Sequence, residues 1–391
     1  MIPLQERRVP SAFSLFNLGF RPFFIAAALS GAGLISTWLL SWPSNNPSPY
    51  FMSAIHWHAH EMLFGFTLAV IAGFLLTAVR NWTSIQTLRG PWLAALTMLW
   101  AAGRITPLLP LPPWSVALTD LLFLPLLAAA LAWPILKARN YRNLVFLALL
   151  AGLFAGNLLV HLEQLGVAVA TARPGLHAAL YLVVAMMLLM GGRVIPFFTE
   201  RGLDSFKARR QPRLERLVLP LALLWALCWS LEWQIPALLL SAANLGLHTR
   251  RQYGWLQAQI GRVPLLWILH LGYLFISLGF ALQLLSPLLG WSPSVPLHAF
   301  AAGAIGSLTL GMMARVSLGH TGRELAIPRG IGTAFALMGL AGLLRVTLPL
   351  TPLPYSVSLQ LAGGCWILAW LLFLFRYASM LCRPRVDGLY G

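Results

Sequence analysis

The chain has 391 residues, of which 59% are hydrophobic and only 9% are charged, and its mean hydropathy is +0.76. A water-soluble domain could not cover so many apolar side chains with so few polar ones. The composition therefore excludes a soluble globular protein and predicts an all-α polytopic membrane protein. The net charge of +17 raises the separate question of a nucleic-acid partner.

Apolar runs recur along nearly the whole chain, each close to the roughly 20 residues that a helix needs to cross about 30 Å of hydrocarbon. The first run is too long for a typical signal peptide, so we expect it to be retained as the first span. About twelve transmembrane helices are predicted. They lie at residues 22–42, 57–79, 91–106, 115–136, 142–161, 174–192, 214–231, 235–249, 263–286, 295–317, 330–350 and 355–381.

The basic residues gather in every second loop, beginning with Arg7 and Arg8 before the first span. The intervening loops contain only Arg104, Arg173 and Arg345. The positive-inside rule therefore places both termini and the basic loops in the cytoplasm. This distribution accounts for the net charge, because basic loops fix topology and contact anionic lipid. We expect the lipid bilayer as a partner and no nucleic acid.

A sequence repeat relates distant parts of the chain. Arg104-Ile-Thr106, followed by Pro113-Trp-Ser-Val-Ala-Leu118, returns 241 positions later as Arg345-Val-Thr347 with Pro354-Tyr-Ser-Val-Ser-Leu359. The copies are separated by an even number of spans, so they form a parallel repeat. A more divergent third copy lies between them. The pattern predicts one membrane domain over residues 1–391, with pseudo-threefold repeats of four helices at about 22–136, 142–249 and 263–381.

Six histidines fall near the outer ends of their predicted helices. Ionisable side chains inside a bilayer are costly and usually functional, and imidazole is a common ligand of haem iron and copper. The alternative is that the histidines only join helices by hydrogen bonds. The six are His56, His58, His60, His161, His177 and His298, and His270 lies deeper, about 10 Å above the cytoplasmic start of its span.

The motif HWHAHEM at 56–62 presents its histidines in two directions. At about 100° per residue, His56 and His60 share one face of a helix, whereas His58 lies about 200° from His60. The two rings of His58 and His60 cannot easily bind one metal. They can serve two sites, or one can support a ligand from outside the coordination sphere.

Glu61 and two arginines are the charged residues that accompany these histidines. Glu61 either orients a histidine or acts catalytically, by carrying protons to a buried reaction centre. Arg104 and Arg345 are equivalent in the repeat. They either bind the propionates of a haem or anchor the helices at the membrane interface. The three cysteines stand apart without a CxxCH sequence, which argues against covalently attached haem.

Four stretches resemble the NnrS family over essentially the whole chain. They are FNLGFRPFF at 16–24, WHAHEMLFGF at 57–66, GGRVIPFFT at 191–199 and LHAFAAGAIGSLTLGMMARVSLGHTGR at 297–323. The resemblance implies a bacterial inner-membrane protein that contains haem b and copper and is linked to denitrification and to protection against nitric oxide. It includes His58, His60, Glu61 and His298 in its motifs. His161 and His270 also look like family positions, whereas His56 and His177 match less clearly.

The predicted architecture is also similar to the catalytic subunit of haem-copper oxidases and nitric oxide reductases, where histidines on spans two, six and ten bind haems and copper. The chain departs from that pattern in two places. Its seventh span, LVLPLALLWALCWSL, lacks the adjacent His-His pair, and its tenth span has one outer histidine. Fold similarity alone does not establish the chemistry.

The leading hypothesis is a protein of nitric oxide metabolism that binds nitric oxide near the periplasmic face. His298 would pair with His60 or His58 as axial haem ligands, and the other outer histidines would hold a second haem or copper. As an enzyme it would be a nitric oxide reductase that forms nitrous oxide with electrons from quinol or a partner protein. The alternative is a non-enzymatic transporter or sensor for haem, copper or a nitrosyl-iron species.

Overall fold

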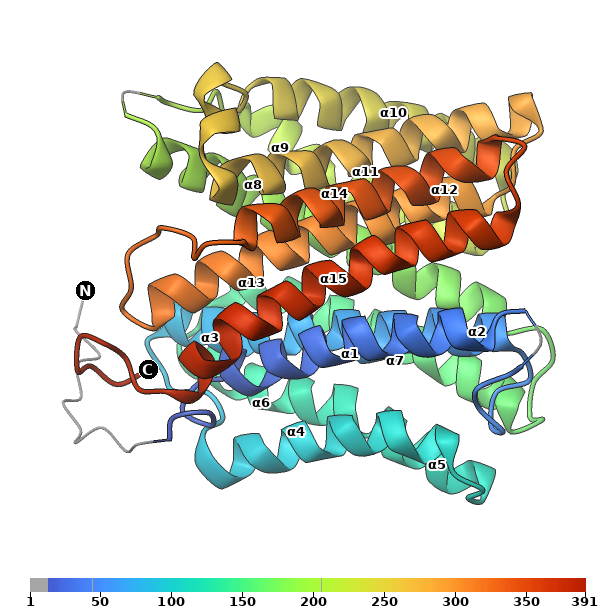
Figure 1. The fold of residues 1–391 in the computed structure, drawn as a ribbon, viewed down its shortest axis with the longest axis horizontal. Coiled ribbons are helices and arrows are strands. Elements are labelled where there is room, and N and C mark those ends of the chain that lie inside the picture. Colours follow the sequence, from blue (N-terminus) through green and yellow to red (C-terminus); the bar gives the residue numbers. More distant parts are fainter. Residues whose placement is uncertain (1–12, 44, 205) are drawn as a thin grey trace. The chain divides into compact units, whose positions relative to one another are not determined.

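The computed structural model describes residues 13–43, 45–204 and 206–391, so Arg7 and Arg8 lie outside the described residues. Within these ranges the chain is helical and has no strand, as the apolar runs predict (Figure 1). Its contacts divide it into two compact units. Unit 1 comprises Met1–Ala179, Met313–Pro328 and Trp370–Gly391, and unit 2 comprises Leu180–Met312 and Arg329–Ala369.

Nine helices of the described residues are long and apolar enough to cross a membrane. The chain is therefore a multi-pass membrane protein. Each of the nine coincides with a predicted span. They are Phe20–Ser41, Ala54–Thr83, Pro113–Lys137, Tyr141–Gln164, Ala172–Gly202, Pro264–Leu289, Ser294–His320, Ile331–Leu350 and Tyr355–Cys382.

The other three predicted spans are helices as well, but they do not belong to this set of nine. They are α4 (Gly90–Ile105), α9 (Pro212–Ser230) and α10 (Gln234–Tyr253). α4 has only 16 residues, and α9 and α10 carry charged or polar residues at one end. The count of twelve spans therefore stays a prediction.

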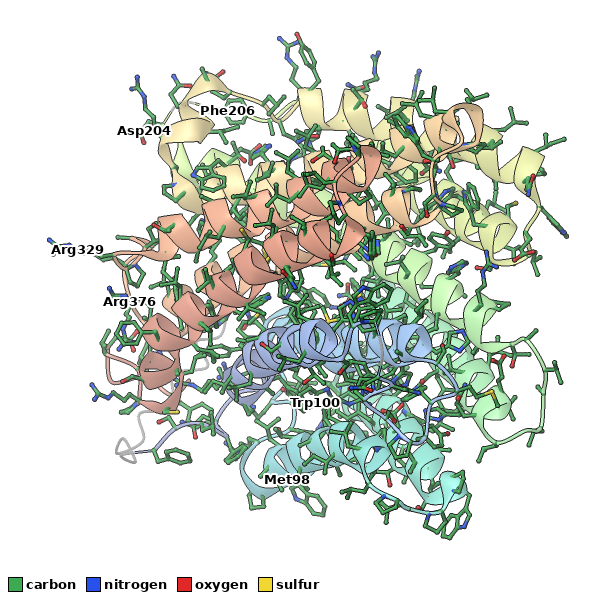
Figure 2. The ribbon with its side chains drawn as sticks, turned by 45° about the vertical axis from the view of Figure 1, so that its right-hand side comes forward. Met98, Trp100, Asp204, Phe206, Arg329 and Arg376 are labelled. Atoms are coloured by element: carbon green, nitrogen blue, oxygen red, sulfur yellow. The ribbon has the colours of Figure 1, made fainter. Side chains whose placement is uncertain are left out.

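In unit 1, α1 (Phe20–Ser41) packs against α3 (Leu68–Thr83), and α6 (Phe123–Lys137) packs against both α3 and α7 (Leu144–Gln164). The start of α1 lies very close to α3. A Cβ atom at Gly19, the residue before α1, would collide with the Leu76 side chain on α3. On α4, Met98 is exposed whereas Trp100 is buried (Figure 2).

In unit 2, α11 (Pro264–Leu289) packs against α10 and against α14 (Ile331–Thr347). Small residues permit the close packing of these helices, as is usual between membrane helices. A Cβ atom at Gly303 would collide with the ring of Phe275 on α11, and one at Gly342 would collide with the Gly303 backbone.

Two of the long helices share an uncommon construction. Ala54–Thr83 consists of α2 (Ala54–His60), the π-helix η1 (Glu61–Thr67) and α3. Ser294–His320 consists of α12 (Ser294–His298), the π-helix η5 (Ala299–Ile305) and α13 (Gly306–His320). In both helices the π-helical turns directly follow a histidine of the predicted site. Such turns are rare and are frequently found at functional sites.

The two best copies of the sequence repeat have the same order of elements. In unit 1, α4 leads through the 3₁₀ turn η2 (Thr106–Leu108) to α5 (Pro113–Leu121). In the other copy, α14 leads through the 3₁₀ turn η6 (Leu348–Leu350) to α15 (Tyr355–Cys382), whose residues from Trp370 on belong to unit 1. Arg104 and Arg345 each lie in the last turn before the 3₁₀ turn. The remaining elements are η3 (Tyr141–Asn143), α8 (Ala172–Gly202) and η4 (Ala258–Arg262).

Candidate metal centre

His60 lies at the end of α2, where the helix widens into η1. The side chain of Ser53 caps the start of α2 by accepting a hydrogen bond from the backbone N–H of His56 at 3.1 Å, which satisfies one of the unpaired donors of the first turn. Glu61 is the first residue of η1. The side chains of His60 and Glu61 are both fully buried, although they are adjacent in sequence.

The ring of His60 is held at both nitrogens. Nδ1 is 3.1 Å from Glu61 Oε1, and Nε2 is 2.9 Å from Asn157 Oδ1 and 3.3 Å from Asp120 Oδ2. The carboxylate of Glu61 can only accept a hydrogen bond, so Nδ1 carries a proton. The contact with Glu61 therefore fixes the orientation of the ring and directs Nε2 towards Asp120.

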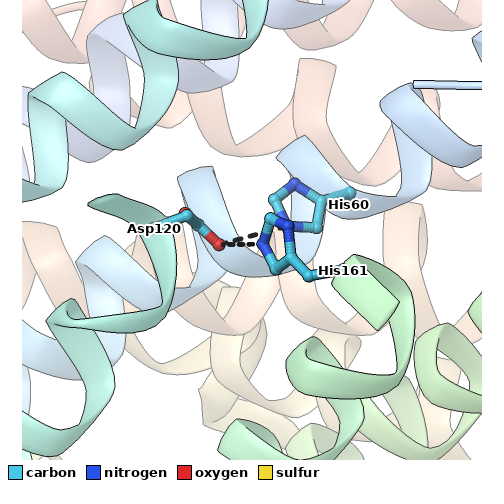
Figure 3. A group of neighbouring side chains, drawn as sticks. All are labelled: His60, Asp120 and His161. Carbon is cyan, nitrogen blue, oxygen red and sulfur yellow. Dashed lines mark hydrogen bonds and ion pairs between the residues drawn. The ribbon is translucent and has the colours of Figure 1, made fainter. Parts of the chain in front are cut away.

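His161 presents its own Nε2 to the same carboxylate oxygen. Nε2 is 3.0 Å from Asp120 Oδ2, and Nδ1 shares a 2.7 Å hydrogen bond with the hydroxyl of Tyr50. Asn157 lies one helical turn before His161 on α7, and its Nδ2 donates to Asp120 Oδ2 at 2.7 Å. One ligand atom each from His60, Asp120 and His161 lies within 4.8 Å of the other two (Figure 3).

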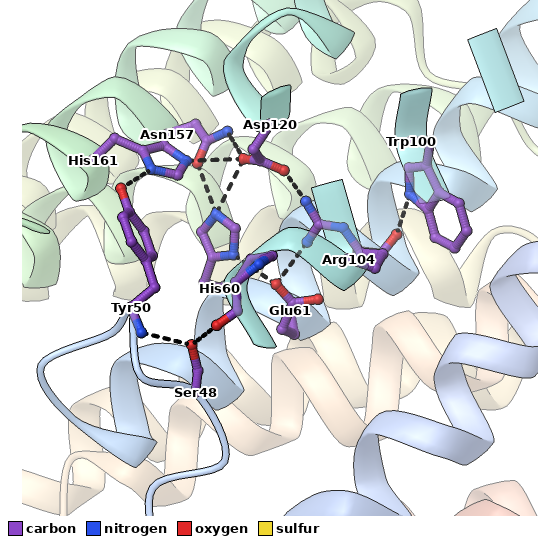
Figure 4. Close-up of polar contacts among 11 residues, drawn as sticks. Ser48, Tyr50, His60, Glu61, Trp100, Arg104, Asp120, Asn157 and His161 are labelled. Carbon is purple, nitrogen blue, oxygen red and sulfur yellow. Dashed lines mark hydrogen bonds and ion pairs between the residues drawn. The ribbon is translucent and has the colours of Figure 1, made fainter. Parts of the chain in front are cut away.

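Arg104 joins the acidic side chains of the centre. Its Nη1 donates to Glu61 Oε1 at 2.8 Å, and its Nη2 forms an ion pair with Asp120 Oδ1 (Figure 4). The buried group thus has two carboxylates and one guanidinium, and it carries a net charge of −1 if both imidazoles are neutral. Uncompensated buried charge is costly. Either a proton on an imidazole or a bound cation would balance it.

The donor set of the centre suits a transition metal. Two imidazoles and one carboxylate are the ligand set typical of non-haem iron, and imidazole and oxygen ligands also suit copper(II). Ligand histidines usually donate their second N–H to a carboxylate or another oxygen, and Glu61 and Tyr50 occupy these positions next to His60 and His161. The residues present therefore fit a metal ion.

The structure brings together four residues that the sequence analysis singled out: His60, Glu61, Arg104 and His161. His58 faces elsewhere in unit 1, where its ring stacks on Trp38 with centroids 4.5 Å apart. This agrees with the two directions expected from helical geometry.

The other predicted residues of unit 1 lie further out. His56 is partly exposed, and its Nδ1 is 3.9 Å from a carboxylate oxygen of Glu163. His177 is partly buried near the start of α8. Neither belongs to the three-residue group of His60, Asp120 and His161.

Unit 2 contains the remaining predicted residues. His298 Nδ1 is 2.7 Å from the backbone carbonyl of Ser294. His270 Nε2 is 3.0 Å from Thr199 Oγ1. Arg345 is buried and donates to the hydroxyl of Tyr355 at 2.6 Å. Any pairing of His298 with a histidine of unit 1 stays a prediction.

Sequence reasoning missed Asp120, Asn157 and Tyr50. One signal could have found Asp120: it is an acid inside an apolar span, where ionisable residues are usually functional. The repeat sharpens this signal, because the matching position of the other copy is Leu361. Asn157 and Tyr50 carry no comparable signal, since uncharged polar residues are common in such segments.

Comparison with known proteins adds an independent observation. The family described as "NnrS protein" matches residues 14–385, nearly the whole chain. The chain belongs to the NnrS family. No curated protein matches it. The metal-ligand group of this NnrS chain therefore lies in a multi-pass membrane protein, inside the segment that the family match covers.

Proposed function

We propose that this NnrS chain holds copper at His60, Asp120 and His161, binds haem b at other histidines, and binds nitric oxide at these groups. The observation that carries the proposal is the buried three-residue group. With both imidazoles neutral the group has a net charge of −1, which favours a cation, and Glu61 and Tyr50 contact the second nitrogens of the two rings, as is usual for ligand histidines. The proposed role in nitric oxide metabolism rests on membership of the NnrS family.

The proposed haem ligands are His298 and, because His60 faces Asp120, His58. The Ser294 carbonyl can only accept a hydrogen bond, so the proton of His298 lies on Nδ1 and the lone pair lies on Nε2. This tautomer suits an axial ligand of haem iron. Arg345 supports a propionate contact, because its buried Nη1 has no hydrogen-bond partner among the described residues. Arg104 would also contact a propionate, through the N–H groups that do not bond to Glu61 or Asp120.

As a reductase, the protein would convert two nitric oxide molecules, two electrons and two protons to nitrous oxide and water. Bound metals would supply the binding of nitric oxide and its reduction. Glu61 is the proposed proton carrier, since its Oε1 contacts His60 and Arg104 while its Oε2 has no partner within the described residues. Quinol or a partner protein would supply the electrons.

The wider proposal is a bacterial inner-membrane protein with twelve spans, cytoplasmic termini and three repeats, similar in plan to haem-copper oxidase subunits. Two observations support it. α4, α9 and α10 occupy the three predicted spans outside the nine, and π-helical turns follow both His60 and His298. The basic residues near the ends of α3, α13 and α15 agree with one cytoplasmic face.

One observation favours a carrier over an enzyme. Asp120 Oδ2 accepts one hydrogen bond from Asn157 Nδ2 and faces both histidines, so a proton on one imidazole would balance the charge of the group when no metal is bound. A site that is stable when empty can release its cargo. The second candidate function is therefore transport or sensing of copper, haem or a nitrosyl-iron species.

Absorption spectra and metal analysis of the detergent-purified protein test the proposal. After expression with ample haem, we expect a Soret band that shifts when nitric oxide is added, and stoichiometric copper. His298→Ala should lose the band, whereas His248→Ala, a matched control on another helix of unit 2, should keep it. Absence of the band in the unmodified protein would refute the haem assignment.

A kinetic experiment separates the two candidate functions. A reductase should consume nitric oxide steadily when a quinol is supplied, because each turnover regenerates the site. A carrier should show one stoichiometric binding phase and then stop.

A further inference from the structure

The basic end of unit 1 contains a buried arginine that the proposed function does not use. Arg21 lies in the first turn of α1, within the family motif at 16–24, and its side chain is fully buried. Its Nη1 donates to the backbone carbonyls of Leu381 and Arg383, both at 2.7 Å. The Leu381 carbonyl lies in the last turn of α15 and the Arg383 carbonyl one residue after the helix, where carbonyls have no partner inside the helix. One nitrogen of Arg21 therefore caps α15.

The other two nitrogens of Arg21, Nε and Nη2, have no hydrogen-bond partner among the described residues. Nε and Nη2 form one edge of the guanidinium, which suits two oxygens of a carboxylate or phosphate. Arg251 and Arg385 use this same edge. Arg251 donates from it to Glu215 at 2.7 and 2.5 Å, and Arg385 donates from it to Asp387 at 2.9 and 2.5 Å.

The surroundings of Arg21 are positive. The charges of Arg323 and Arg385 act on its guanidinium, and none of the ion pairs between described residues includes Arg21. The nearest acid of the C-terminal segment, Asp387, is already held by Arg385. A buried cation without a counter-ion costs several kcal/mol. Among the described residues Arg21 has no counter-ion, so the arrangement suits an added anion.

The C-terminal segment fixes the neighbouring arginines in place. The backbone N–H of Val386 donates to the Thr321 carbonyl at 3.1 Å, and Arg385 Nη1 donates to the His320 carbonyl at 3.1 Å. The hydroxyl of Tyr390 donates to the Asn17 carbonyl at 2.9 Å. Two family motifs, at 16–24 and at the end of 297–323, are thereby joined to the C-terminal segment.

We propose that the Nε and Nη2 edge of Arg21, with Arg323 and Arg385 beside it, binds a phosphate group. Arg323 and Arg385 are only partly buried, so the positive charge extends from Arg21 towards the surface. Basic sites between membrane helices bind the headgroups of acidic phospholipids, and free phosphate offers the same oxygens. The bound phosphate supplies the counter-ion that Arg21 does not find among the described residues.

Native mass spectrometry and thermal unfolding of the full-length, delipidated protein test this site. The probes are phosphatidylglycerol, zwitterionic phosphatidylcholine and inorganic phosphate, each added to the protein in detergent. The informative variant is Arg323→Gln, because its side chain makes only a 3.5 Å contact with the Thr321 carbonyl. Arg376→Gln, an exposed arginine on α15 (Figure 2), is the matched control.

We expect phosphatidylglycerol to raise the unfolding temperature of the unmodified protein and to stay bound in the mass spectrometer. Arg323→Gln should raise the half-maximal lipid concentration roughly tenfold, since one charged contact is lost, while Arg376→Gln should not change it. A shift with the lipid alone identifies the headgroup as the ligand. An equal, variant-sensitive shift with inorganic phosphate identifies the free anion.

Two results would overturn the proposal. One is the absence of a shift with both anionic probes. The other is an equal effect of Arg323→Gln and Arg376→Gln, which would mean that the anion interacts with the general positive charge. Arg21→Lys adds a second measurement, because lysine keeps the charge but lacks the two-nitrogen edge. It should weaken phosphate binding at least as much as Arg323→Gln.

Discussion

At the scale of single residues, the balance of charge around His60 is the feature with most chemical consequence. Glu61 and Asp120 bring two negative charges into a buried place, and Arg104 neutralises one of them. The remaining charge can be balanced by a proton or by a metal ion. Of these two, only a metal ion also satisfies the ligand geometry of His60, Asp120 and His161.

Asp120→Asn tests this balance. It removes a ligand, so the copper content should fall at least tenfold. With both imidazoles neutral it also brings the metal-free charge to zero, so the unfolding temperature of the metal-free protein should not fall. Metal analysis and thermal unfolding measure the two effects. Asp204→Asn, which changes an exposed acid outside the centre, should alter neither. A large loss of metal-free stability in Asp120→Asn would contradict the charge argument.

Tyr50 positions His161 through a single hydrogen bond. Burial raises the pKa of Tyr50 above its ordinary value, so the phenol stays protonated at neutral pH and the bond persists. Tyr50→Phe should weaken metal binding by about tenfold to a hundredfold, measured by competition with a chelator. The exposed Tyr141→Phe serves as the control, and equal affinities in the two variants would exclude a positioning role.

At the scale of elements, the π-helix η1 lets a helix bury two adjacent polar residues, His60 and Glu61. The Gly65 carbonyl in η1 accepts a hydrogen bond from the backbone N–H of Leu68 and a second from Trp100 Nε1 at 3.1 Å. Gly65 lies against the side chains of the candidate metal centre. A Cβ atom there would lie 3.1 Å from Arg104 Cδ and 3.3 Å from Glu61 Oε2.

Gly65→Ala should therefore disturb the centre without removing any of its polar groups. Arg104 and Glu61 would have to shift by a few tenths of an ångström, so we expect weaker metal binding and an unfolding temperature lower by a few degrees. Gly33→Ala on α1 is the control, because a Cβ atom there meets nothing within 4 Å. If both variants bind metal as the unmodified protein does, η1 has no role in shaping the centre.

At the scale of the whole molecule, the arginines and the apolar runs predict which loops face the cytoplasm. This can be tested with single cysteines in a chain whose three native cysteines are replaced by serine. Lys137→Cys lies at the end of α6, next to a basic loop, and Leu109→Cys lies in an intervening loop, and both positions are exposed. In spheroplasts, a membrane-impermeant maleimide should label position 109 and leave position 137 unlabelled, and the reverse pattern would invert the topology.

The sequence by itself determined the class of protein, the positions of the helices and the family. These properties follow from hydropathy, from the arginines in the loops and from sequence motifs, each of which can be read from a local segment. It also identified His60, His161, Glu61 and Arg104 as candidates. It could not say that these four residues meet, since helical periodicity fixes a side chain's direction on its own helix and not the neighbour it faces.

The tertiary structure decided the composition of the centre. Asp120 and Asn157 lie 60 and 97 positions after His60, and only the packing of α2, α5 and α7 brings the three together. The same holds for Arg21, whose partners on α15 lie about 360 residues away. Such contacts depend on the rotation of each helix against its neighbours, which results from the packing of many side chains along their whole length.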